Sequence, residues 1–149
     1  MKVTVLAPAK INLSLDILGK RPDGYHLVKM LMQSVDLCDI VSVWDTGDGK
    51  ISLSCNADGV PCEKTNTAWR AAEAFFTFTK KRNPGIGIKI KKRIPVSAGL
   101  AGGSTDAAAV LVALNELMNT RLSKEELCDI GEDVGADVPF CIMGATMVA

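Results

Sequence analysis

The amino-acid sequence predicts one domain of the α+β class. Alternating apolar residues, which are typical of strands, fill the first part of the chain, whereas most helical periodicity comes later. Regular alternation of strand and helix, which would indicate a parallel sheet, is scarce. A length of 149 residues suits a single hydrophobic core, so residues 1–149 are expected to form one domain.

The first strand is predicted between Met1 and Leu18, where apolar and polar residues alternate. Because successive side chains of a strand point to opposite faces, we expect Ile11 and Leu13 to anchor it in the core. The apolar face holds Ile11, Leu13, Leu15 and Ile17, and the polar face holds Lys10, Asn12, Ser14 and Asp16.

The segment after this strand contains the signals of two turns. The motif KRPDGYH at residues 20–26 predicts a tight turn, and residues 27–37 fit either a strand or a helix. Two apolar alternations at 39–45 and 50–55 are joined by TGDG. We therefore expect those two segments to pair as a hairpin.

A helix is predicted from Asn66 to Lys81, with apolar residues at three-to-four spacing and Pro84 just beyond its end. Asn66 stands where a helix N-cap belongs. The period then returns to two in residues 86–94, which predicts another strand.

Two more helices are expected in the last third of the chain. An apolar stripe runs from Ala107 to Met118, and Ser123 with Glu126 forms a capping box before a short helix that should end near Gly135. The carboxyl end, residues 140–149, is apolar to its last residue. We expect the chain to stop inside a strand of a longer protein.

Between the predicted strand 86–94 and the next helix lies the glycine-rich stretch PVSAGLAGGSTDAAA. Free amides of a helix's first turn, and the positive end of its dipole, suit a phosphate group. Gly99, Gly102 and Gly103 would let the backbone approach an anion, while Ser104 and Thr105 offer hydroxyl donors or a magnesium ligand. The stretch fits neither the Walker A ending nor the GxGxxG spacing, and a closely packed strand-to-helix turn is the structural alternative.

Composition excludes several classes of function. Seventeen basic and 17 acidic residues cancel, so nucleic acid is not an expected partner. Neither a signal peptide nor a run long enough to span a bilayer is present, so we expect a soluble cytoplasmic protein without a membrane partner. Five cysteines without a CxxC pair indicate reduced thiols, and His26 as the single histidine excludes a histidine metal cluster.

Four basic residues precede the glycine stretch, namely Lys89, Lys91, Lys92 and Arg93. They are interpreted as a solvated strand face rather than as a polyanion surface. The aromatic residues Trp44, Trp69, Phe75 and Phe76 are interpreted as packing residues.

The glycine stretch resembles the nucleotide loop of the GHMP kinases, PxxxGLxxGSSxxAA. The matching residues are Pro95, Gly99, Leu100, Gly103, Ser104, Ala107 and Ala108, and Thr105 departs only by a methyl group. Three further motifs, PAKINL at 8–13, RPDGYH at 21–26 and GADVPF at 135–140, are similar to those of one member. That member phosphorylates a cytidine-diphosphate-linked methylerythritol on its 2-hydroxyl group, for isoprenoid precursor synthesis.

The resemblance implies a ribosomal-protein-S5-domain-2-like fold, with this chain as the N-terminal ATP-binding domain. Family members of this kind are about twice as long, so the C-terminal domain is expected as a missing partner, and the fragment alone is expected to be inactive. ATP and Mg²⁺ are the implied cofactors, and no metal ligand is assigned.

The resemblance also implies roles for individual residues. Lys10 and Asp137 would be catalytic, with Asp137 accepting the hydroxyl proton and Lys10 stabilising the developing charge. Asn12 and Asp137 would meet the methylerythritol end of the substrate, and Tyr25 and His26 the cytidine end. ATP would be bound by Pro95, Val96, Ser97, Ala98, Gly99, Leu100, Ala101, Gly102, Gly103, Ser104 and Thr105.

Two alternatives remain open from the sequence. One is another GHMP kinase, of the homoserine or mevalonate type. The other is a non-catalytic nucleotide-binding or RNA-binding module of the same fold, in which Lys10 is a solvated lysine and Asp137 caps a turn.

Overall fold

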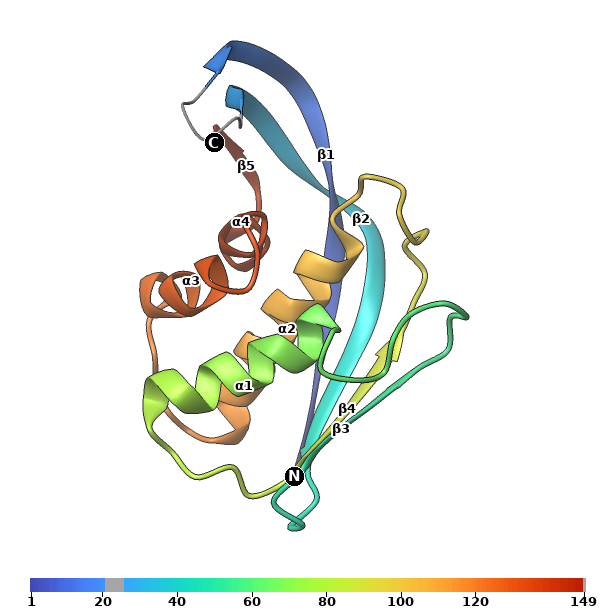
Figure 1. Cartoon of the computed structure of the whole chain (residues 1–149), viewed down its shortest axis with the longest axis vertical. Helices are drawn as coiled ribbons and strands as arrows, with labels where there is room; N and C mark the ends of the chain where they lie inside the picture. Colours follow the sequence, from blue (N-terminus) through green and yellow to red (C-terminus); the bar gives the residue numbers. More distant parts are fainter. Residues whose placement is uncertain (21–25, 149) are drawn as a thin grey trace.

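The computed structural model describes residues 1–20 and 26–148, and it confirms the α+β class. In this part of the chain one sheet carries all helices on a single face (Figure 1). The strands are β1 (Lys2–Lys20), β2 (His26–Asp45), β3 (Ile51–Cys55), β4 (Ile86–Lys91) and β5 (Thr146–Val148). The helices are α1 (Thr67–Thr79), α2 (Gly102–Leu117), α3 (Lys124–Glu132) and α4 (Val138–Met143).

The sheet is built around the long antiparallel pair β1–β2. The order of its strands is β1-β2-β4-β3, and β5 pairs with β2 farther toward the amino end of that strand. The ambiguous segment 27–37 is therefore strand, continuous with 39–45 in β2. Since β4 pairs with residues 40–45 and β5 with residues 31–33, both partners share one edge of β2.

The predicted hairpin between 39–45 and 50–55 is wrong, because β4 lies between β2 and β3. β4 pairs antiparallel with β2 and parallel with β3. Its isoleucines Ile86, Ile88 and Ile90 are almost completely buried, whereas Ile51 and Leu53 of β3 are only half-buried. The more apolar strand takes the central position, and the chain reaches it from β3 through α1.

The predicted faces of β1 are also wrong in part. The strand itself is confirmed, but Leu13 is 54% exposed and Leu15 50%, whereas Lys10 on the supposed polar face is only 5% exposed. The β1–β2 register shifts between Pro8 and Lys10 and again between Asn12 and Ser14. Each irregularity changes the face on which later side chains lie, so the alternation does not continue from the core into the far half of the strand.

The helical layer packs small residues against a β-branched sheet face. Ala68, Ala71 and Ala72 of α1 and Ala107 to Ala109 of α2 are buried with the isoleucines of β4. Alanines let these two helices approach closely, while Phe75 and Leu111 supply larger buried area. α2 lies centrally and contacts β1, β2, α1, α3 and α4.

The predicted caps are confirmed. The Asn66 side chain accepts a hydrogen bond from the Ala68 amide at 2.8 Å, and Ser123 and Glu126 form the reciprocal capping box of α3. α3 ends at Glu132 rather than near Gly135, and the sequence analysis did not predict α4. Pro139 lies in the first turn of α4, a position that suits proline because the amide it lacks would have no helical partner there.

Candidate functional site

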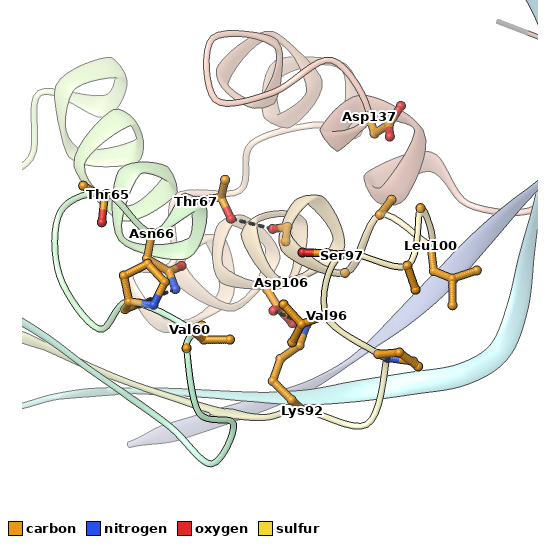
Figure 2. A pocket seen from close by; sticks show the side chains of 18 residues that line it. Val60, Thr65, Asn66, Thr67, Lys92, Val96, Ser97, Leu100, Asp106 and Asp137 are labelled. Atoms are coloured by element: carbon orange, nitrogen blue, oxygen red, sulfur yellow. Dashed lines mark hydrogen bonds and ion pairs between the residues drawn. The ribbon is translucent and has the colours of Figure 1, made fainter.

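A cavity of about 570 Å³ opens beside the glycine loop, defined here as residues 95–101, which connects β4 to α2. Its wall combines residues 59–61, residues 65–67 at the start of α1, residues 95–103, and the side chains of Lys92, Asp106 and Asp137. Figure 2 shows Asn66 and Asp137 at opposite ends of this pocket. The predicted ATP-binding stretch therefore lines a cavity from Pro95 to Gly103.

The start of α2 leaves its first amides without a side-chain cap. Ala101 is the N-cap residue, with a φ of 57°, and it makes no side-chain hydrogen bond to the helix. The first amides of an α-helix have no intrahelical partner. These donors and the positive end of the helix dipole lie next to residues 95–99 of the loop, which are exposed. The combination of free amides, a helix dipole and an accessible loop suits the binding of an anion.

The two helix starts meet at the cavity. Thr67, the first residue of α1, donates its hydroxyl proton to the Gly103 carbonyl at 2.7 Å (Figure 2). A Cβ on Gly103 would lie only 3.2 Å from that hydroxyl oxygen. The Asn66 side chain caps the Ala68 amide of α1, whereas no side chain caps α2. The sequence did not indicate the role of Thr67, because its partner is 36 residues away.

Ser104 and Thr105 do not line the cavity wall. Thr105 is 1% exposed and donates its hydroxyl proton to the Pro8 carbonyl at 2.8 Å. The Thr105 hydroxyl thus fastens α2 to β1, and its role as a phosphate or magnesium ligand stays a prediction. No group of three metal-ligating side chains is found within residues 1–20 and 26–148.

The structure brings Lys10 and Asp137 together from the two ends of the chain. The Lys10 ammonium lies 3.6 Å from the Asp137 carboxylate and donates a hydrogen bond to the Asn12 side chain at 2.9 Å. Asp137 precedes α4 without capping it and is one-third exposed at the cavity. The Lys10 amide also donates to the Leu100 carbonyl at 3.1 Å, which joins this pair to the glycine loop.

The structure gives little or no description of the two residues predicted to bind the cytidine end. Tyr25 lies outside the described residues, and His26 is described only as the first residue of β2. The Asn66 side chain, besides capping α1, donates to the Pro61 carbonyl at 2.7 Å and lines the cavity.

Sequence reasoning missed a buried ionic cluster behind the glycine loop. The Lys92 side chain is 7% exposed, so its interpretation as part of a solvated face is wrong, although Lys89, Lys91 and Arg93 are exposed as expected. Its ammonium donates to Asp39, and to Asp106 at 2.9 Å. Burial lowers the pKa of Lys92, but hydrogen bonds to the two carboxylates outweigh it and raise this pKa above its ordinary value.

The Asp106 carboxyl is buried beside the Lys92 ammonium. Burial raises its pKa to about 7, although its hydrogen bond to Lys92 and the charge of Lys92 act in the opposite direction. One of its oxygens, Oδ1, has no hydrogen-bond partner among the residues that the structure describes. A period-two pattern cannot reveal such a cluster, because its members are 53 and 14 residues apart.

No helix in the described part of the chain has the length and apolarity needed to cross a membrane. All five cysteines are free, in agreement with the expectation from their number and spacing.

Comparison with known proteins gives a family match and several relatives. The family model of the GHMP kinases N terminal domain matches residues 66–145. The chain is 51% identical over 149 residues to a 4-diphosphocytidyl-2-C-methyl-D-erythritol kinase of Brevibacillus brevis, covering 100% of this chain and 51% of that protein. It is 54% identical over 144 residues to one from Clostridium botulinum, covering 97% and 51%. The chain thus spans about half the length of the curated relatives it matches.

Solved structures share the fold. A crystal structure of 4-(cytidine 5'-diphospho)-2C-methyl-D-erythritol kinase superposes with a TM-score of 0.81 at 35% identity, over 99% of this chain and 51% of that one. Homoserine kinase from Cytophaga hutchinsonii superposes with a TM-score of 0.80, over 99% of this chain and 48% of that one. At 19% identity the second likeness shows the fold alone.

Proposed function

Since the chain belongs to the GHMP kinases, whose N-terminal domain model matches residues 66–145, we propose that it is the ATP-binding domain of a small-molecule kinase. The proposed reaction transfers the γ-phosphoryl group of ATP to the 2-hydroxyl group of 4-diphosphocytidyl-2-C-methyl-D-erythritol, the substrate that the names of its relatives contain. Residues 1–149 form this domain, and a C-terminal domain like the other half of the relatives completes the substrate cleft.

The observation that carries the proposal is the Lys10–Asp137 pair beside the glycine loop. The Asp137 carboxylate would accept the proton of the attacking hydroxyl group, which requires contact at hydrogen-bond distance. Lys10, 3.6 Å away, would stabilise the negative charge that develops there. Asn12 holds the Lys10 ammonium through a 2.9 Å hydrogen bond and would also meet the alcohol.

The residues of the cavity suit ATP. The uncapped amides of α2 and the exposed loop 95–99 would hold the polyphosphate, and the wall formed by Val60, Pro61 and Asn66 would receive the nucleoside. Mg²⁺ would be held mainly by phosphate oxygens and water, since neither Ser104 nor Thr105 lines the cavity. When bound, ATP and Mg²⁺ supply the phosphoryl group and neutralise its charge.

The cytidine end of the substrate is assigned to Tyr25 and His26 by family resemblance. We also propose a cytoplasmic location, because five free thiols suit a reducing compartment.

The test uses a longer protein that contains this chain followed by the second half found in its relatives. Asp137→Ala should lower kcat by about 10²–10⁴-fold while leaving the Kd for ATP nearly unchanged, because only the proton acceptor is lost. Asp133→Ala, at an exposed site four residues earlier, is the matched control and should retain full turnover. Near-normal turnover in Asp137→Ala contradicts the assignment.

A panel of acceptors then tests the substrate. The cytidine diphosphate alcohol should be phosphorylated, whereas homoserine and mevalonate should not. ATP binding without transfer to any acceptor would indicate a non-catalytic nucleotide-binding module instead.

A further inference from the structure

Three charged side chains from different elements meet beneath the glycine loop, where those of Lys92 and Asp106 also form part of the cavity wall. Asp39 comes from β2, Lys92 directly follows β4, and Asp106 lies in α2. Asp39 is 0% exposed and Asp106 3%. The Lys92 ammonium bonds both carboxylates, so the three residues form one connected ionic cluster.

This cluster fastens both ends of the glycine loop. At the entry, Asp39 Oδ1 accepts the backbone amides of Arg93 at 2.5 Å and Ile94 at 2.9 Å, directly before Pro95. At the exit, Asp106 anchors α2 to Lys92 at 2.9 Å. The loop therefore leaves and re-enters the body of the domain at two points held by the same buried charges.

The loop between these points needs such restraint. Ser97 and Ala101 have φ values of 59° and 57°, in the left-handed region that is unfavourable for a residue with a side chain. Residues 95–99 are exposed and gain little from packing. Backbone amides arranged at such a cost bind an anion well only if neighbouring structure keeps them in place.

The fit around the Lys92 ammonium is close. A Cβ on Gly102, the first residue of α2, would lie 2.9 Å from Lys92 Nζ and 3.4 Å from Ile94 Cγ2. The ammonium thus packs directly against the backbone of the helix start, and Figure 2 shows Lys92 and Asp106 together behind Val96 of the loop. Displacement of Lys92 would be transmitted to the amides themselves.

We propose that Asp39, Lys92 and Asp106 are positioning residues that hold the glycine loop and the first amides of α2 in the conformation that binds polyphosphate. The inference rests on the proposed function in that the anion is the polyphosphate of ATP. The cluster acts on nucleotide affinity, and the phosphoryl-transfer step itself depends on Lys10 and Asp137.

The cluster also has a variable charge. With Asp106 ionised its net charge is −1, and with Asp106 protonated it is zero. Asp106 faces Lys92 and Asp39, and the thiol of Cys141 in α4 is near enough for the Asp106 charge to raise its pKa. Negative charge behind the loop opposes a bound polyphosphate, so ionisation of Asp106 weakens nucleotide binding.

The test measures the Kd for ATP by calorimetry, and kcat at saturating ATP, in the longer protein described above. The double variant Lys92→Met with Asp106→Leu removes one positive and one negative charge together, and leaves Asp39 bonded to backbone amides. It should raise the Kd about 10–100-fold, because charge-assisted hydrogen bonds are lost, while kcat changes less than twofold. Lys91→Met, an exposed neighbour, is the control and should leave both values unchanged.

Asp106→Asn provides a second readout, which a purely structural role would not move. The Kd of the unmodified protein should rise more steeply between pH 6 and pH 8 than that of Asp106→Asn, in which the titrating group is absent. Comparing the two proteins cancels the titration of ATP itself. If the double variant does not fold, the Kd for ATP of Asp106→Asn decides, and a Kd equal to that of the unmodified protein at both pH 6 and pH 8 overturns the positioning role.

Four results separate the possible failures. Folded variants that bind ATP with the original Kd, or that lose kcat at saturating ATP as strongly as affinity, overturn the positioning role. Parallel pH profiles of the Kd overturn the charge effect assigned to Asp106, and the Kd values of the variants then decide the positioning role. Absence of ATP binding by the unmodified protein overturns the proposed function instead.

Discussion

Replacing Asp106 with asparagine should remove a pH dependence from the stability of the protein. Burial raises the pKa of Asp106 from its ordinary value of 3.8 to about 7, against the opposing influence of Lys92. The folded protein then retains a proton that the unfolded chain has released. The free energy of unfolding contributed by this group is therefore greatest below pH 4 and falls as pH rises through about 7.

The magnitude follows from the difference between the folded and unfolded pKa values. At pH 5 the group lies about two units below its folded pKa, and each unit corresponds to about 1.36 kcal/mol. The unmodified protein should thus lose roughly 3 kcal/mol of stability between pH 5 and pH 8 through Asp106 alone. Lys92 adds nothing in this window, because its pKa is raised from an ordinary value of 10.5.

Urea unfolding at pH 5, 6, 7 and 8 measures this contribution. The quantity to follow is the free energy of unfolding of the unmodified protein minus that of Asp106→Asn, since other titrations cancel in the difference. Asp58→Asn, at an exposed position, is the control and should give a flat difference. Parallel stability curves for the unmodified protein and Asp106→Asn would refute the reasoning, because they would mean that Asp106 is already ionised at pH 5.

Two further predictions concern other parts of the cavity and core. Asn66→Ala should lower the free energy of unfolding by about 1–2 kcal/mol, because Asn66 caps the Ala68 amide and also bonds the Pro61 carbonyl. Asn66→Asp keeps the cap and should recover part of that loss in the same urea titration, whereas an unchanged midpoint in Asn66→Ala would contradict the cap assignment. Burial raises the pKa of Cys141 to about 12, so iodoacetamide at pH 8 should modify the exposed Cys62 and spare Cys141 until the protein is unfolded. Peptide mass spectrometry can follow this, and equal labelling rates in the folded protein would show that Cys141 is accessible.

The sequence predicted those features that depend on neighbouring residues. The helix that begins after Asn66, the capping box at Ser123 and the strand–glycine loop–helix order all follow from local periodicity and cap chemistry. Motif resemblance also selected Lys10 and Asp137, which the structure brings within 3.6 Å although they lie at opposite ends of the chain.

Features that depend on distant segments were not predictable in the same way. Residues 39–55 contain two strand patterns joined by a turn, and nothing in them predicts that β4 will lie between the two strands. The position of β4 depends on the burial of Ile86, Ile88 and Ile90, which are distant along the chain. Leu13 and Leu15 alternate as a core strand would, but register shifts earlier in β1 leave them exposed. In the sequence Lys92 looks like its solvent-exposed neighbours, because its two partners, Asp39 and Asp106, come from other elements of the fold.

The central place of β4 in the sheet has a consequence for biosynthesis. As the chain emerges from the ribosome, β1 and β2 can pair early. β3 must wait, because its one sheet neighbour among the described residues, β4, is made about 30 residues later. Until Ile86–Lys91 is translated, the carboxyl-terminal half of β2 offers a bare edge to any other nascent strand. When β4 emerges, it pairs with this free edge of β2 and with β3. The sheet is therefore completed only after the segment directly before the glycine loop has been synthesised.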